Sequence, residues 1–83
     1  MKYTTEKHGT EDEALVVLVR CFAVEMLTKL DKKAKEGFSG WDDPDTISDG
    51  MLLESLKRHL RRGNYVDVAN LAAFLWNRQE STK

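Results

Sequence analysis

The residues best suited to chemistry are Asp67 and Asn70, which lie three positions apart in the segment 64–76. If this segment is an α-helix, both side chains leave the same narrow polar arc, because successive residues rotate by about 100°. A carboxylate and an amide placed this way would offer a metal ligand and a hydrogen-bonding group to a bound molecule. The alternative, which the residues alone favour, is that this arc is the solvent-facing side of the helix.

Trp41 is the third candidate for ligand binding, since its ring would stack on a bound molecule. An isolated aromatic in a small helical domain more often packs in a core or an interface, and this alternative is favoured. The aspartates around it do not complete a calcium-binding loop, because Ile47 and Leu56 occupy two of the ligand positions. We therefore interpret these aspartates as turn formers and helix caps, and expect neither a metal nor another cofactor.

A basic patch follows in the next segment and consists of Lys57, Arg58, Arg61 and Arg62. Nucleic-acid binding would need interleaved aromatic residues or a base-reading motif, and neither accompanies these charges. The formal net charge of −1 also gives no general attraction to nucleic acid or to anionic membranes. We interpret the patch as a solvated helix face on which Glu54 pairs with Arg58, and weak nucleic-acid binding stays an alternative.

The composition offers no nucleophilic catalytic group, since the chain has two histidines and one cysteine and no arrangement that would activate a nucleophile. A single cysteine also excludes an intramolecular disulfide and fits a reducing, cytoplasmic setting. No apolar run approaches the roughly 20 residues that span a bilayer, so we expect no membrane association. These features favour a protein without enzymatic activity.

The elements that must position these side chains are helices. We predict an all-α fold of three helices, over residues of about 10–36, 48–62 and 64–78. The chain is expected to form a single domain, 1–83, with frayed ends at 1–9 and 79–83. Thr10 and either Ser48 or Asp49 are suitable N-caps, and Gly37 and Gly63 are suitable residues to follow helix ends.

The predicted fold is a long first helix packed against a hairpin of the other two. One broad apolar stripe runs along the first helix: Leu15, Leu18, Val19, Phe22, Ala23, Met26, Leu27 and Leu30. The second helix carries a stripe of leucines within an arc of about 100°: Leu52, Leu53, Leu56 and Leu60. The connector 37–48 contains Phe38, Trp41 and Ile47 and is too apolar for a free linker, so we expect it to pack on the helices.

The helices carry more apolar circumference than one small protomer covers. The excess on the first and third helices defines a predicted oligomer interface: Val17, Cys21, Val24, Leu71, Leu75 and Trp76. Chains of this size without disulfides or a metal are commonly stabilised by oligomerisation. We therefore expect a homo-oligomer, most simply a dimer, and a protein partner is a further expectation.

Several short motifs within residues 22–78 carry a resemblance to a known group of proteins. They are Lys29-Leu30-Asp31, Gly40-Trp41, Met51-Leu52-Leu53-Glu54 and Asp67-Val68-Ala69-Asn70-Leu71-Ala72. Together they resemble small phage and prophage proteins related to the all-α MazG-like nucleoside triphosphate pyrophosphohydrolases. The resemblance implies helical hairpins that assemble as dimers or tetramers and hold Mg²⁺ through an E-x-x-E motif and an E-x-x-D motif.

Only half of the carboxylates implied by this resemblance are present. Glu54 matches the first motif, but Lys57 stands where its second glutamate belongs, and Asn64 replaces the glutamate that precedes Asp67. Magnesium is held tightly only where several oxygen ligands converge, so Glu54 and Asp67 alone make a poor site. We therefore expect a non-catalytic, self-associating accessory or regulatory module that binds a protein or a nucleotide-like ligand. A pyrophosphohydrolase with a reduced Mg²⁺ site at Glu54 and Asp67 is the alternative.

Overall fold

The computed structural model describes residues 10–81, which form three helices and no strand. The helices are α1 (Glu11–Lys35), α2 (Asp49–Arg61) and α3 (Tyr65–Ser81). The predicted all-α class and the three predicted helices are confirmed. One boundary is wrong, because α3 continues through residues 79–81, which were expected to fray. The expected fraying of 1–9 and of 82–83 falls outside the described residues.

The N-terminal ends of α1 and α2 are fixed by the predicted caps. The Thr10 hydroxyl accepts a hydrogen bond from the Glu13 amide at 3.1 Å, and the Ser48 hydroxyl accepts one from the Met51 amide at 3.2 Å. Ser48, rather than Asp49, is therefore the N-cap of α2. Each hydroxyl satisfies an amide that has no partner within its own helix, which favours starting the helix at that residue.

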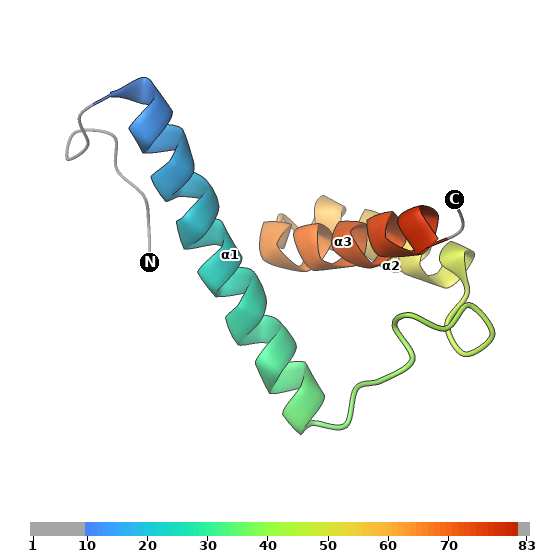
Figure 1. Ribbon diagram of the computed structural model, residues 1–83. Helices are drawn as coiled ribbons and strands as arrows, with labels where there is room; N and C mark the ends of the chain where they lie inside the picture. The colour runs from blue at the N-terminus through green and yellow to red at the C-terminus, as the bar shows by residue number, and fades with distance from the viewer. Residues whose placement is uncertain (1–9, 82–83) are drawn as a thin grey trace.

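A tight turn at Gly63 joins α2 to α3 and makes them a hairpin. Gly63 has a φ of +73°, and its amide and that of Asn64 donate to the carbonyls of Leu60 and His59. This pair of hydrogen bonds ends α2 and reverses the chain, and a side chain at Gly63 would strain the backbone. The hairpin lies against one side of α1, mainly through α3 (Figure 1).

The aromatic residues of the connector cover one side of α3. Phe74 is buried and stacks with the ring of Trp41 at a centroid distance of 5.1 Å and with the ring of Phe38 at 6.2 Å. Ile47 in the same connector is half-buried. The expectation that this segment packs on the helices is confirmed, and the favoured interpretation of Trp41 as a packing residue holds for one face of its ring.

The hydrophobic core is small. Among the described residues, the buried hydrophobic side chains are Leu52 of α2 and Phe74 of α3. The leucine stripe of α2 is only partly covered, since Leu56 is half-buried while Leu53 and Leu60 are exposed. A protomer with so little enclosed apolar volume gains limited stability from burial alone.

The hairpin leaves the first half of α1 uncovered. The hairpin crosses α1 steeply instead of running along it, so it meets only part of this 25-residue helix (Figure 1). The hairpin lies beside the second half of α1, and the first half projects beyond it (Figure 1). No residue of α1, all of which the structure describes, is fully buried.

This placement corrects the expectation about the two faces of α1. The predicted core stripe was expected to face the hairpin, yet most of it is exposed: Leu15, Leu18, Val19, Phe22 and Leu27. Of the opposite face, Val24 is exposed, while Val17 and Cys21 are half-buried. A helical wheel ranks faces around the helix but carries no information on how far along the helix a partner reaches.

None of the helices in the described part of the chain is long and apolar enough to cross a membrane.

Candidate functional site: a polar cluster and an apolar groove on α3

The polar arc of α3 faces the interior of the fold. Asp67 is 7% exposed and Asn70 is 3% exposed. Both are turned toward the second half of α1, where they meet polar groups. The favoured prediction, that this arc is the solvent-facing side of the helix, is therefore wrong. Instead, Trp76 from the wide apolar arc of the same helix lies in solvent with 62% of its surface exposed.

Asp67 is held by a lysine from α1. The Lys29 ammonium donates to Asp67 Oδ2 at 2.7 Å, and His59 Nδ1 of α2 lies 3.7 Å from the same oxygen. The short charge-assisted contact offsets the cost of taking the carboxylate out of water. Lys29 remains about half exposed, so this ion pair lies at the edge of the α1–α3 interface rather than in a dry core.

Asn70 makes one hydrogen bond and leaves one polar atom without a partner. Its Nδ2 donates to the main-chain carbonyl of Met26 at 3.3 Å. This contact fixes the orientation of the amide, and its Oδ1 is buried and receives no hydrogen bond from the described residues. A buried acceptor in this state costs about 1–3 kcal/mol, so Asn70 is a feature that packing alone does not explain.

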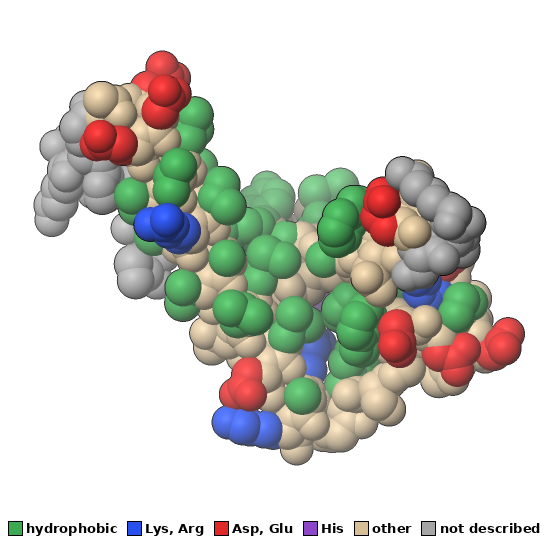
Figure 2. Space-filling view, viewed as in Figure 1, with side chains coloured by type: hydrophobic (Ala, Val, Ile, Leu, Met, Phe, Trp, Pro, Cys, Tyr) green, Lys and Arg blue, Asp and Glu red, His purple; other side chains and the backbone are tan. Residues whose placement is uncertain are grey.

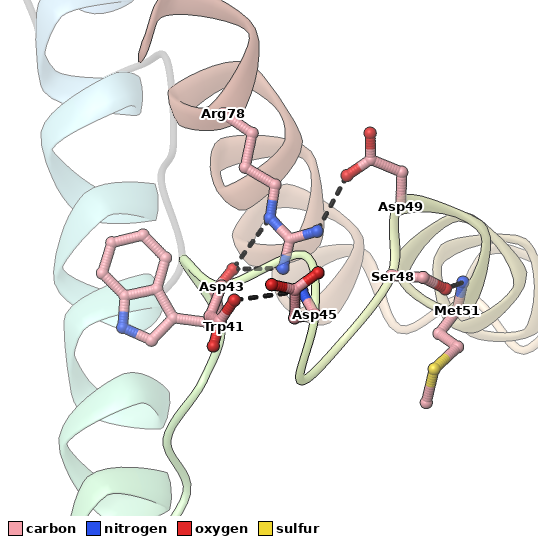
Figure 3. Close-up of polar contacts among 7 residues, drawn as sticks. All are labelled: Trp41, Asp43, Asp45, Ser48, Asp49, Met51 and Arg78. Atoms are coloured by element: carbon pink, nitrogen blue, oxygen red, sulfur yellow. Dashed lines mark hydrogen bonds and ion pairs between the residues drawn. The ribbon is translucent and has the colours of Figure 1, made fainter. Parts of the chain in front are cut away.

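Arg78 ties the far end of α3 to the connector. It is 7% exposed, and its Nε and Nη2 both donate to the Trp41 carbonyl, at 3.1 and 2.7 Å (Figure 3). Its Nη1 donates to Asp49 Oδ1 at 2.8 Å at the start of α2. One guanidinium thus connects α3, the connector and α2, and it holds Trp41 over Phe74.

The connector is also ordered by one of its aspartates, Asp43. Asp43 accepts hydrogen bonds from the Thr46 hydroxyl at 2.7 Å and from the Asp45 amide at 3.0 Å (Figure 3 shows the contact with Asp45). The hydroxyl contact, together with the amide contact, lowers the pKa of the exposed Asp43 carboxyl below its ordinary value of 3.8. This carboxylate acts as a turn former.

An apolar groove of about 780 Å³ opens beside the polar cluster. It lies among the second half of α1, the connector, α2 and α3. Its walls include apolar side chains from all four: Leu30, Phe38, Ile47, Met51, Leu52, Leu53, Leu71 and Phe74. Its polar lining includes Lys33, Glu54, Arg58, His59, Asp67 and Asn70. A concave apolar site with a few polar groups at its edge is typical of a binding site for an apolar or amphipathic partner.

The groove brings some of the predicted site residues together. Asp67 and Asn70 of α3 line it together with Glu54 of α2. Trp41 does not line it but stacks on Phe74, which does.

The residues of the basic patch are all exposed: Lys57, Arg58, Arg61 and Arg62. Arg58 also lines the groove, and its Nη2 donates to the Ser55 hydroxyl at 3.2 Å. Glu54 lies nearest to Lys57, at 3.8 Å, so the expected pairing of Glu54 with Arg58 is not the contact present.

The metal alternative gains little from this geometry. Within residues 10–81, no group of three or more His, Cys, Asp or Glu side chains is placed to hold a metal ion. Asp67 already has the Lys29 ammonium as its partner, and the Glu54 side chain is largely exposed. A divalent ion at this position would have to displace Lys29 to reach the carboxylate.

Sequence reasoning missed Lys29, Phe74 and Arg78 as parts of the cluster and its support. Lys29 looked like one of several lysines that complement the negative end of a helix, and nothing in local spacing marks a contact over 38 positions. Arg78 shares the polar arc of its helix with Asp67 and Asn70, and this shared arc was the available signal that it is buried with them.

The predicted oligomer interface is in part accessible on the protomer. Val24 and Trp76 are exposed, and the other four residues are half-buried: Val17, Cys21, Leu71 and Leu75. Leu71 also lines the groove. Figure 2 shows hydrophobic side chains gathered along α1 and in the hollow between α1 and the hairpin.

No protein-family model, curated protein or solved structure matches this chain.

Proposed function

We propose that this protein is a non-catalytic helical module that self-associates as a dimer and serves as an accessory or regulatory protein of phage or prophage type. In that role it would bind a protein or a nucleotide-like ligand. The observation that carries the proposal is the uncovered first half of α1, whose most exposed apolar side chain, Val19, has 65% of its surface in solvent. Contiguous exposed apolar surface of this kind typically marks an interaction site.

The total surface of the protomer supports the same proposal. Its accessible surface is 6406 Å², whereas a compact monomer of this length exposes about 5,000 Å². Its radius of gyration is 15.0 Å, against about 12 Å for a compact domain of this length. An excess of roughly 1,400 Å² is larger than the roughly 800 Å² that one subunit contributes to an interface of standard size.

Sedimentation over a dilution series tests this proposal. The wild-type chain is expected to change from dimer to monomer as its concentration falls, and Val19→Glu is expected to shift this change to higher concentration. Loss of the buried valine contact costs about 1.5–3 kcal/mol, or at least tenfold in affinity. Leu60→Glu on α2 is the matched control, since it puts the same charge on an exposed apolar position of the hairpin. Only monomer at micromolar concentrations would remove the proposal.

A nucleoside triphosphate pyrophosphohydrolase is the second candidate, because Glu54 and Asp67 line the same groove. The pairing of Asp67 with Lys29 weighs against it, since the ammonium already neutralises the carboxylate. Pyrophosphate release from a panel of nucleotides with Mg²⁺ or Mn²⁺ discriminates the two candidates. Activity that disappears in Asp67→Ala would favour the hydrolase, and activity indifferent to that change would reject a mechanism based on Asp67.

A further inference from the structure

The uncovered half of α1 has the pattern of a helix that docks into a groove. Four exposed apolar side chains, Leu15, Leu18, Val19 and Phe22, follow the spacing i, i+3, i+4 and i+7. This spacing places them on one face, and it is the arrangement by which an amphipathic helix fills an apolar groove. We call residues 11–24 the arm. Within the protomer the arm projects beyond the hairpin (Figure 1), and none of its residues lines the groove.

The groove has the lining to receive such a helix, since apolar side chains of α1, the connector, α2 and α3 all face it. Four parts of the chain surround it and contribute the apolar walls described above. The second half of α1 forms one wall, through Leu30 and Lys33.

The charges at the two ends of α1 indicate how two copies would meet. The first turn carries Glu11, Asp12 and Glu13, and the last turn carries Lys32, Lys33 and Lys35. If two α1 helices run antiparallel, the acidic turn of each lies beside the basic turn of the other. A parallel pair would place like charges together, which is unfavourable. The acidic turn is visible at the tip of α1 (Figure 2).

We infer that the arm of each protomer docks into the groove of a second copy, with the two α1 helices antiparallel, so that a symmetric dimer fills both grooves. This inference rests on the proposed self-association and names the surface that each copy buries. A two-fold dimer is closed by this exchange, because each copy offers one arm and one groove. In this dimer the second half of each α1 lies beside the partner's arm, because it forms one wall of the groove that this arm fills.

The experiment compares three leucine or valine substitutions to glutamate by sedimentation equilibrium. Val19→Glu alters the arm, Leu53→Glu alters the groove, and Leu60→Glu is the control on the same helix as Leu53 but outside the groove. The matched pair is close in exposure, since Leu53 is 43% and Leu60 is 51% exposed, so neither change disturbs the interior of the protomer. Far-ultraviolet circular dichroism checks that each variant keeps its helices.

The expected result is that the arm and groove variants each weaken dimerisation at least tenfold, because each dimer carries the change twice, while the control stays within about threefold of wild type. An equimolar mixture of Val19→Glu and Leu53→Glu is expected to form heterodimers that are tighter than either homodimer. In that heterodimer both defects meet in one arm–groove contact, and the other contact is intact.

Each other outcome overturns the inference in a distinguishable way. If Val19→Glu weakens the dimer and Leu53→Glu behaves like Leu60→Glu, the arms associate without the groove, and only the proposed self-association survives. If the mixture gives no preference for heterodimers, or if the control weakens as much as the groove variant, reciprocal docking is wrong. If the wild-type chain is monomeric at about 100 µM, self-association itself fails, and the groove is left to another apolar occupant.

Discussion

Replacing Arg78 with methionine isolates the contribution of one guanidinium to the position of the connector. Methionine keeps the unbranched apolar stem that packs against the neighbouring side chains but removes every hydrogen-bond donor. The Trp41 carbonyl loses two charge-assisted hydrogen bonds, and Asp49 loses its ion partner. We expect the connector to loosen over Phe74 and the free energy of unfolding to fall.

The magnitude follows from the exposure of the partners. Hydrogen bonds to charged groups contribute about 1.5–3 kcal/mol each, but the two at Trp41 share one acceptor and do not add fully. Asp49 is 71% exposed, and an ion pair that far into solvent contributes at most about 1 kcal/mol. The sum is about 2–4 kcal/mol. In a domain of this size 1 kcal/mol shifts Tm by about 4–8 °C, so Arg78→Met is expected to lower Tm by at least 8 °C.

Urea unfolding followed by circular dichroism measures the change, at one fixed protein concentration because self-association would add its own stabilisation. Asp49→Asn is the control that removes the exposed ion partner alone, and it is expected to cost less than about 1 kcal/mol. Arg78→Lys keeps the charge without the planar set of donors, so its loss of unfolding free energy is expected to lie between those of Asp49→Asn and Arg78→Met. The reasoning is refuted if Arg78→Met stays within about 0.5 kcal/mol of wild type or if Asp49→Asn costs as much.

Two further predictions concern the connector. Gly40→Ala is expected to lower the free energy of unfolding by at least about 1 kcal/mol more than Gly37→Ala, measured by urea unfolding. Both glycines have positive φ, but only at Gly40 would a Cβ lie 2.6 Å from the Thr46 side chain. Equal losses would show that the Thr46 side chain moves away at no cost. NMR titration is expected to give Asp43 a pKa below 3.8, and Thr46→Val is expected to raise this pKa. Because the pKa is depressed in the folded state, the stabilisation by this carboxylate is complete well above pH 3.8 and is lost as pH falls through the folded pKa.

The local part of the fold was predictable from the sequence because its causes are local. Thr10 and Ser48 start helices by hydrogen bonds that reach three residues, and Gly63 ends one by a conformation that glycine adopts without strain. The packing of the connector followed from its aromatic content alone. In each case the stabilising contact lies within a few residues or depends on side-chain type.

The candidate site depended on contacts that local spacing does not encode. A helical wheel shows that Asp67 and Asn70 share an arc, and the polar character of this arc suggested that it faces solvent. The decisive facts are that Lys29 and the Met26 carbonyl lie opposite them, at separations of 38 and 44 positions. These partners offset the cost of burying Asp67 and the Asn70 Nδ2 group, although Asn70 Oδ1 stays without a hydrogen bond from the described residues, and the wide apolar arc is left to face solvent in part.

These polar contacts also explain why the arm stays uncovered. Apolar contacts are non-directional, so a hairpin held by them alone would gain as much by lying over the more apolar first half of α1. The ion pair of Lys29 with Asp67 and the hydrogen bond from Asn70 form only where the hairpin meets the second half of α1. A slide of one helical turn toward the first half would put Glu25 in the place of Lys29, so that Asp67 would lose its cation and meet a second carboxylate, which is unfavourable. The buried polar pair therefore fixes the position of the hairpin, and by doing so it leaves the apolar arm available to a partner.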